Sequence, residues 1–257
     1  MPLLSPRCPV PPREQAWIEK MLAWCVERVG DLPLRSRVVE PTTEFFPDPY
    51  LGAGPDVLRV VDRVRVLLGI DADRVEVELA VNEASGDLDA MLLQPGRRTV
   101  VAGHYQQRGE RGYIRIDPLE AGDQSRLVAV AAHEFCHELL LGRGGVPGAD
   151  GKDHEPLTDL LTVFTGFGVF TANAAFSFES SPSGWRTRRL GYMNVPMFGY
   201  ALACCSWLRG EVESREQPHW ARFLDANPRG YMKQGSRYLE ALGPSPALAG
   251  LRSPRNG

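Results

Sequence analysis

Hydrophobic and polar positions divide the first half of the chain into helical and extended segments. Apolar residues spaced three and four apart predict amphipathic helices over residues 13–29 and 55–68. Alternation of apolar and charged residues over 74–80 predicts a half-buried strand, and two more strands are expected at 99–104 and 112–117. We therefore expect this half to contain helices and a small, mostly antiparallel sheet.

Apolar runs dominate the second half of the chain. Residues 128–141 contain neither Gly nor Pro and follow Asp123, a good N-cap, so they are predicted to form one helix. Residues 160–178 carry no charge and reach membrane-spanning length, but Gly, Asn and Thr dilute their hydrophobicity. We expect a buried helix packed behind residues 128–141 rather than a membrane span. The uncharged run 191–208, which contains Asn and Pro, fits a membrane even less well.

The predicted segments form two connected parts with loose ends, in an α+β fold. Residues 13–142 make an N-terminal α+β part that ends in the apolar helix, and residues 143–242 make a mostly helical C-terminal part. The Pro-rich residues 1–12 are expected to be a disordered tail, and 243–257, rich in Pro, Gly and Ser, a loose one. Helices of the C-terminal part are predicted at 197–209, 218–224 and 230–242.

Composition and charge narrow the classes of partner and compartment. The 257 residues include 29 Lys plus Arg and 32 Asp plus Glu, a net charge of −3, so neither nucleic acid nor a membrane surface is expected as a partner. The five cysteines are odd in number and irregularly spaced, which favours a reducing compartment over a disulfide framework. Residues 1–12 lack the apolar segment of a signal peptide, and we therefore expect a cytoplasmic protein.

The predicted helix at 128–141 carries an unusual polar set. His133 and His137 are four residues apart, so about 400° of helical rotation puts both imidazoles on nearly the same face. Glu134 completes the arrangement His-Glu-x-x-His, which binds zinc through the two imidazoles and uses the Glu as general base. The alternative is a helix with two surface histidines paired with Glu134 and Glu138. A mostly apolar helix is a costly place for these groups unless something binds them, so we favour zinc.

A catalytic zinc usually has three protein ligands, and the next candidates along the chain are His154 and Glu155. Glu155 begins a second predicted helix, because Pro156 suits the first helical position and apolar residues follow. Asp159 shares a face with Glu155, where a carboxylate can accept the free N–H of a ligating histidine and fix its tautomer. His154 also fits a solvent-facing residue in a polar run, and Cys136 fits a small buried hydrophobe.

The pattern His133-Glu134-x-x-His137 followed by Glu155-x-x-x-Asp159 resembles the gluzincins, the thermolysin-like branch of the zinc metallopeptidases. The resemblance implies that His133, His137 and Glu155 bind one zinc ion. It also implies that Glu134 activates water and that Asp159 orients a ligand histidine.

This resemblance extends over residues 113–165 and implies a zincin-like fold, in which the sheet packs on the zinc helix. The spacer between His137 and Glu155 is slightly shorter than in thermolysin, and many secreted thermolysin-like enzymes carry the signal peptide that this sequence lacks. The metzincin pattern needs a third histidine soon after His137, and residues 141–144 offer none.

Further site features are expected from the same resemblance. In zincins an extended peptide pairs with an edge strand before the metal helix, a role that falls here to 112–117 or 99–104, although each also fits an ordinary interior strand. His104, at the end of one of these strands, is expected to make a routine surface contact. Gluzincins also place an Arg near the substrate carbonyl and a His or Tyr near the oxyanion. Candidates are Arg186, Arg188 and Arg189 for the first role, and Tyr192, Tyr200, Tyr231 and His219 for the second.

The sequence thus predicts a zinc-dependent hydrolase, a metallopeptidase that cleaves a peptide or amide bond of a peptide or protein substrate with a zinc-activated water. The alternative is a non-catalytic zinc-binding protein in which the metal ties two helices together. Glu134 argues against this alternative, because a structural site needs no base and usually closes with a fourth protein ligand. An intramembrane protease is a third possibility, which the diluted apolar runs disfavour.

Overall fold

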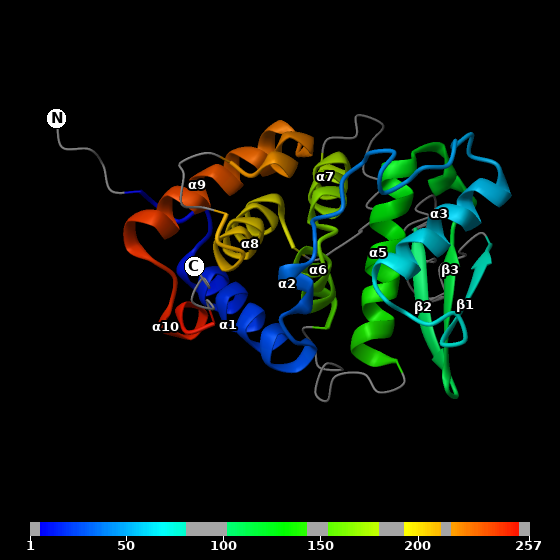
Figure 1. Ribbon diagram of the computed structural model, residues 1–257, viewed down its shortest axis with the longest axis horizontal. Helices are drawn as coiled ribbons and strands as arrows, with labels where there is room; N and C mark the ends of the chain where they lie inside the picture. The colour runs from blue at the N-terminus through cyan, green and yellow to red at the C-terminus, as the bar shows by residue number, and fades with distance from the viewer. Residues whose placement is uncertain (1–5, 81–101, 143–153, 180–192, 212–216, 252–257) are drawn as a thin grey trace, which may run out of the picture.

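A computed structural model describes residues 6–80, 102–142, 154–179, 193–211 and 217–251. Helices and one small sheet make up this part of the chain, which confirms the predicted α+β class (Figure 1). The elements in chain order are α1 (Pro12–Val29), α2 (Leu32–Arg35), α3 (Gly54–Leu67), β1 (Val75–Leu79), β2 (Gly103–Arg108), β3 (Arg111–Ile116), η1 (Pro118–Gly122), α5 (Gln124–Leu141), α6 (His154–Phe164), α7 (Gly168–Glu179), α8 (Val195–Leu208), η2 (His219–Phe223), α9 (Ala226–Leu242) and α10 (Pro246–Ala249).

The described sheet has the strand order β1-β3-β2. β2 and β3 form an antiparallel hairpin whose two-residue turn begins at Gly109, where φ is 61°, whereas β1 runs parallel to β3. The sheet is therefore mixed, and the prediction of a mostly antiparallel sheet was wrong, because alternation within a strand does not specify its neighbour. β3, which covers most of the predicted strand 112–117, is the central strand and not an edge.

β2 lies later in the sequence than predicted, at Gly103–Arg108 instead of 99–104. Residues 99–101 lie outside the described residues. The second half of β2 consists of Gln106, Gln107 and Arg108, so no apolar alternation marks it as a strand. Its position is fixed instead by the hairpin register with β3.

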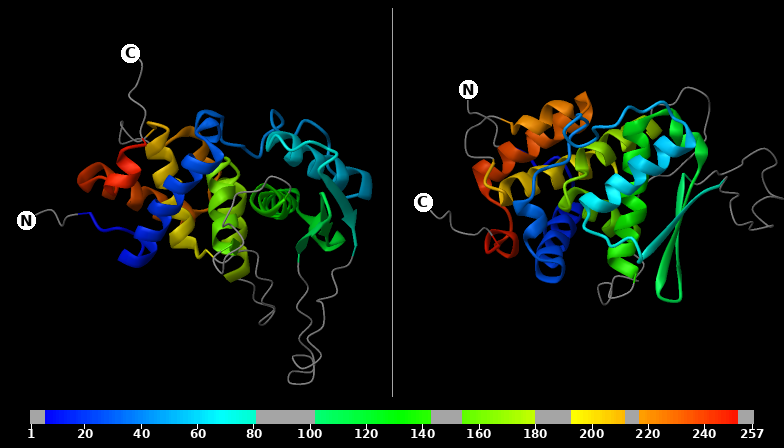
Figure 2. Two further views of the ribbon diagram at one scale, coloured as in Figure 1. Left: turned by 90° about the horizontal axis from the view of Figure 1, so that it is seen from below. Right: turned by 45° about the vertical axis from the view of Figure 1, so that its right-hand side comes forward.

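α5 lies at the centre of the molecule, between two layers (Figures 1 and 2). The sheet and α3 lie on one side of α5, and α6 and α7 lie on the other. Every residue of α5 from Leu127 to Glu138 is buried, which explains the nearly continuous apolar run in its sequence. Groups that α5 holds are therefore placed at the junction of the sheet and the C-terminal helices.

In the uncharged run 160–178, nearly all residues from 160 to 175 are buried as predicted, but the run is divided between two helices. α6 ends at Phe164 and α7 begins at Gly168, with Gly166 between them at a φ of 96°. A residue with a side chain is strained at this positive φ, so Gly166 permits the break. Across the described ranges, no helix combines the length and the apolar character needed to cross a membrane.

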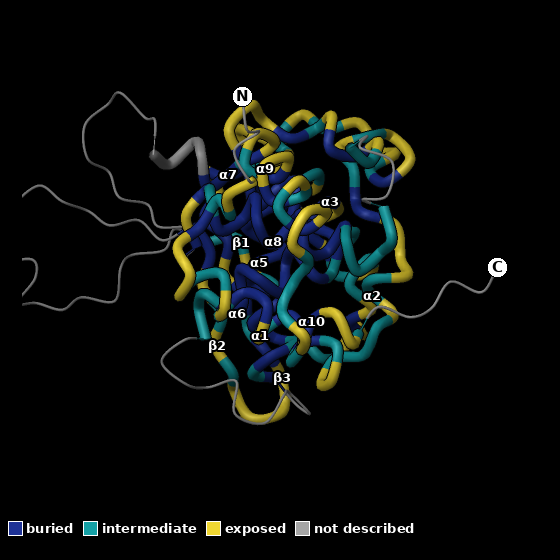
Figure 3. Tube along the Cα trace, turned by 90° about the vertical axis from the view of Figure 1, so that its left-hand side faces the viewer, coloured by how far each residue is buried: buried dark blue, intermediate teal, exposed yellow. Residues whose placement is uncertain are grey.

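Both described ends of the chain reach the core. Val10, within the predicted N-terminal tail, is 5% exposed, and Leu248 of α10, within the predicted C-terminal tail, is 0% exposed. α10 packs against α1, and the buried segments gather around α5 and α8 in Figure 3. Residues 218–224, predicted as an amphipathic helix, form only the short 3-10 helix η2.

A buried carboxylate joins α1, α8 and the segment before α10. Glu19 of α1 is 1% exposed. It accepts hydrogen bonds from the Gln15 amide at 3.0 Å, the Tyr200 hydroxyl at 2.5 Å and the Ser245 backbone N–H at 2.5 Å. Several donors thus satisfy this charge inside the helical layer.

Candidate metal centre

The start of α5 follows from its sequence. The Asp123 side chain accepts the backbone N–H groups of Ser125 and Arg126 at 2.8 and 3.2 Å, which confirms the predicted N-cap. The helix ends at Gly142, whose N–H bonds to the Glu138 carbonyl at 2.9 Å. These ends fix α5 between the sheet and α6, and with it His133 and His137.

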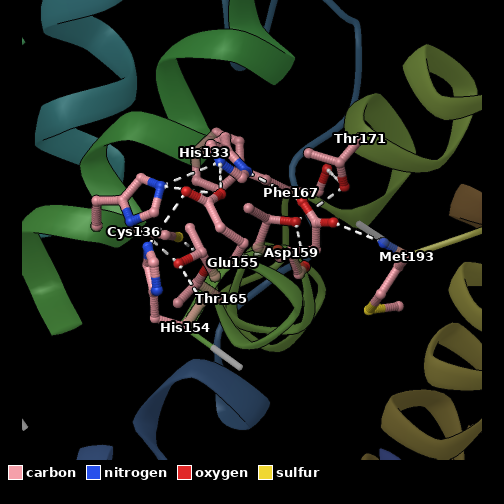
Figure 4. A network of polar contacts seen from close by, with 12 residues as sticks. His133, Cys136, His154, Glu155, Asp159, Thr165, Phe167, Thr171 and Met193 are labelled. Carbon is pink, nitrogen blue, oxygen red and sulfur yellow. Dashed lines mark hydrogen bonds and ion pairs between the residues drawn. The ribbon is translucent and has the colours of Figure 1, made fainter. Parts of the chain in front are cut away.

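The structure brings together three predicted ligands, His133, His137 and Glu155 (Figure 4). The two Nε2 atoms are 3.2 Å apart, and Glu155 Oε2 lies 3.3 Å from that of His133 and 3.5 Å from that of His137. Both histidines come from α5, and Glu155 comes from the first turn of α6. The two histidines are 6% exposed and the Glu155 side chain is 27% exposed, so the three donor atoms converge at a site that is open on the Glu155 side.

The other ring nitrogen of each histidine has a partner on α6. His133 Nδ1 lies 3.0 Å from Asp159 Oδ1, as predicted for an orienting carboxylate. His137 Nδ1 lies 3.2 Å from the Thr158 hydroxyl, which itself donates to the His154 carbonyl at 2.8 Å. Because that hydroxyl proton is committed, Thr158 accepts from the Nδ1–H of His137. Both Nε2 atoms therefore present lone pairs to the centre of the cluster.

Thr158 contacts the donor group, and the sequence did not single it out. It lies next to Asp159 in the turn after Glu155, and a Thr at that position is a signal that could have found it. The second oxygen of Asp159 accepts the Met193 backbone N–H at 3.0 Å, so the segment before α8 also holds the cluster in place.

A cation satisfies this donor set. Two imidazole lone pairs and a carboxylate oxygen within 3.2–3.5 Å of one another repel unless a proton or a metal ion lies among them. The edges of a tetrahedron with zinc–ligand bonds of about 2.0–2.1 Å are roughly 3.3–3.4 Å long, close to the three spacings here. The group can therefore hold a metal ion, and the types of donor and their spacing suit zinc.

Without a metal, a proton takes the place of the cation. Burial disfavours a charged His133, but hydrogen bonds with Asp159 and Glu155 outweigh burial and raise the pKa of His133 to about 10. Burial lowers the pKa of His137. Burial also opposes ionisation of Glu155, yet hydrogen bonds with the two imidazoles lower the pKa of its carboxyl. One proton, on His133, thus occupies the cluster near neutral pH.

Glu134 lies on the sheet side of α5 and is 5% exposed. A Cβ atom at Gly103 of β2 would lie 2.5 Å from Glu134 Oε1, so only glycine leaves room for this carboxylate beside the strand. Burial raises the pKa of Glu134 to about 7, against the attraction of the His133 charge and a hydrogen bond from the Tyr105 backbone. A carboxyl with this pKa can both take and give a proton near neutral pH.

Glu138, one turn after Glu134, has different partners. Its Oε1 accepts from Arg74 Nη2 at 2.8 Å, and its Oε2 accepts from the Tyr105 hydroxyl at 2.8 Å. The Tyr105 ring stacks on His137, with the ring centroids 6.0 Å apart. Arg74 and Tyr105 were not predicted, because their roles depend on how β1 and β2 meet α5.

The rival ligands lie outside the donor group. His154 Nε2 is 3.3 Å from Oε1 of Glu155, whereas Oε2 is the oxygen that contacts the two imidazoles. Cys136 is buried and its Sγ lies 3.9 Å from the Thr165 hydroxyl. Within the described residues, only His133, His137 and Glu155 form a group of three donors suited to a metal.

The candidates for substrate stabilisation that lie in the described part of the chain are not brought to the cluster. The Tyr200 hydroxyl donates to Glu19, His219 faces Glu40 at 3.7 Å, and Tyr231 packs beside Gly199. His104 lies on β2 and is exposed, in agreement with a surface role. Four further candidates lie outside the described residues, namely Arg186, Arg188, Arg189 and Tyr192.

Comparison of the chain with protein-family models, with curated proteins and with solved structures gave no significant match. The function is therefore inferred from the donor atoms, their partners and the buried carboxylate of Glu134.

Proposed function

We propose that this protein is a zinc-dependent hydrolase, a metallopeptidase of the gluzincin type with a zincin-like fold. One observation carries the proposal: His133, His137 and Glu155 aim lone pairs at one point, beside a buried carboxylate, Glu134, that holds no ligand position. A purely structural zinc site has no use for such a carboxylate. The expected substrate is a peptide or protein.

His133, His137 and Glu155 would hold the zinc ion, and Asp159 and Thr158 would keep the two imidazoles in the tautomer that binds it. When bound, zinc supplies Lewis-acid chemistry, making water more acidic and a carbonyl more electrophilic. Glu134 acts as the base that removes a proton from the attacking water. It then gives that proton to the nitrogen of the leaving amine, a transfer that a pKa near 7 favours.

We assign substrate pairing to β2. This strand is the outer strand of the described sheet beside α5, and in the hairpin register the backbone groups of Gly103, Tyr105 and Gln107 point away from β3. An extended peptide that pairs with this edge would take over these outward backbone groups, including the Tyr105 group that bonds to Glu134 in the unoccupied protein, and would so release the carboxylate of Glu134.

Zinc content and peptide hydrolysis, measured together, test the proposal. The wild-type protein is expected to bind one zinc ion and to cleave members of a broad peptide library. Glu134→Gln should retain zinc and folding while hydrolysis falls at least about 100-fold, the lower range for loss of a general base. Glu138→Gln is the matched control, because the oxygens of Glu138 face Arg74 and Tyr105, and it should keep zinc and most of the activity.

A wild-type protein that binds no zinc after reconstitution would contradict the proposal. A zinc-loaded protein that cleaves no peptide, with Glu134→Gln indistinguishable from wild type, would favour the non-catalytic zinc-binding function instead.

A further inference from the structure

The two carboxylate oxygens of Glu155 face different partners. Oε2 points at the Nε2 atoms of His133 and His137, at 3.3 and 3.5 Å. Oε1 lies 3.3 Å from His154 Nε2. Figure 4 shows the His154 ring on the side of Glu155 away from His133. His154 therefore contacts the oxygen that the donor group does not use.

His154 is also linked to the cluster through its backbone. It is the first residue of α6, and its carbonyl accepts the Thr158 hydroxyl at 2.8 Å. Thr158 in turn contacts His137 Nδ1 at 3.2 Å. The same residue thus contacts Glu155 through its side chain and is linked to His137 by way of Thr158. Its ring centroid lies 5.7 Å from that of His137, and its side chain is 36% exposed.

We propose that His154 is a positioning residue that makes Glu155 a one-oxygen ligand, an inference that rests on the proposed metal site. With a proton on Nε2, His154 donates to Oε1, so this oxygen is engaged and only Oε2 is offered to the metal. A carboxylate free to rotate can bind through both oxygens and take up an additional coordination position. With Oε1 held, three protein donor atoms bind and a position stays open for water, which hydrolysis requires.

The rival role for His154 is that of a fourth protein ligand, which would close the site. Its Nε2 faces Oε1, and His154 does not belong to the group of donors whose atoms lie within 4.8 Å of one another. The observed contacts therefore favour positioning over ligation.

Cobalt substitution tests the inference without any substrate. Four-coordinate Co²⁺ absorbs visible light more strongly than Co²⁺ with more ligands, so the spectrum reports the number of coordinating atoms. In His154→Ala the carboxylate is expected to bind through both oxygens, with a several-fold weaker visible absorption and an affinity for Co²⁺ about 10-fold lower. His154→Gln should restore both properties, because its amide nitrogen can take the place of Nε2 and donate to Oε1. His219→Ala is the control, since His219 faces Glu40 outside the cluster, and it should leave both unchanged.

Each other outcome has a defined meaning. An unchanged spectrum and affinity in His154→Ala would overturn the inference and leave the proposed function intact. If azide does not alter the wild-type cobalt spectrum and His154→Gln fails to restore the affinity, His154 is a ligand and the inference is wrong. A wild-type protein that binds no Co²⁺ would overturn both the inference and the proposed function.

Discussion

Two carboxylates, Glu19 buried in the helical layer and Glu155 half-buried in the candidate metal centre, differ in the atoms that face them. Glu19 is surrounded by groups that own a proton to donate, namely the Gln15 amide, the Tyr200 hydroxyl and the Ser245 N–H. Glu155 Oε2 faces two imidazole Nε2 atoms, and the Nδ1 atoms of the same rings are already bonded to Asp159 and Thr158. Both Nε2 atoms act as acceptors unless a proton or a metal ion is added to the cluster. Burial of an acidic group is therefore a weak sign of function, whereas convergence of acceptors is a strong one.

Both carboxyls are ionised, so their charge does not distinguish the two regions. The regions differ in the groups that supply protons to the carboxylate. Burial opposes ionisation of Glu19, and the bonds from Tyr200 and Ser245 outweigh it and lower the pKa of the carboxyl. Burial is likewise outweighed at Glu155, by hydrogen bonds with His133 and His137, and its pKa is also lowered. The donors to Glu19 keep their protons at any ordinary pH, while His133 can exchange its proton for a metal ion.

The largest expected effect is on metal content. Glu155→Ala should lower the affinity for zinc by more than about 100-fold, the upper end for loss of a supporting contact. The zinc content after dialysis should therefore fall from one ion per chain to below about a tenth of an ion. Glu19→Ala should still bind one zinc ion, because the partners of Glu19 are Gln15, Tyr200 and Ser245, and none of them belongs to the donor group. Elemental analysis after dialysis measures both, and retention of zinc by Glu155→Ala would break the distinction.

Glu19→Ala, the variant that should leave zinc binding intact, is expected to have a large effect on stability. Glu19→Ala should lower the free energy of unfolding by about 3 kcal/mol, because the buried Tyr200 hydroxyl and the Ser245 N–H lose their acceptor. Chemical denaturation measures this change. Glu78→Ala is the control, since Glu78 and Arg115 form an exposed pair and its loss should cost under about 1 kcal/mol. A similar cost for the two variants would show that the Glu19 cluster contributes little.

The pH dependence of zinc affinity is the next expected effect. In the metal-free protein the pKa of His133 is raised to about 10, while those of His137 and Glu155 are lowered, so binding at neutral pH displaces one proton from the ligands. Below pH 10 the affinity should therefore rise as pH rises, by about tenfold per unit between pH 7 and 9.

Competition titrations with a chelator measure this slope, and Asp159→Asn supplies the comparison. Removing the Asp159 charge removes a main cause of the raised pKa of His133. The slope of that variant should therefore flatten above about pH 7. An equal slope in both proteins would show that the displaced proton does not come from His133.

The ligand group was predictable because each part of it is local in the sequence. His133 and His137 share a helix face by spacing alone, and Glu155 and Asp159 do so on the next helix. Only the contact between these two helix faces depends on the tertiary fold. The identity of Thr158 as the partner of His137 depends on the rotation of α6 against α5, which periodicity does not specify.

The surroundings of the site were harder to predict, because they depend on pairs distant in sequence. Gly103 matters only because β2 passes beside Glu134, and Arg74 only because β1 begins near Glu138. The parallel pairing of β1 with β3 was missed for the same reason. The break at Gly166 was missed because a glycine in an apolar run fits a buried helix as well as a helix end.

Glu138 lies close to the candidate site but has the same kind of hydrogen-bond partners as Glu19. It therefore tests whether closeness or the type of partner matters more, and it gives the smallest expected effect. It follows the ligand His137 directly, yet donors face both of its oxygens, as at Glu19. Tyr105→Phe removes one donor and should lower the free energy of unfolding by about 1 kcal/mol. The loss should be equal in the zinc-loaded and metal-free proteins, measured by denaturation of each. A greater loss in the zinc-loaded protein would mean that Tyr105, through its stacking on His137, acts on the metal, and that closeness to the site then outweighs partner chemistry.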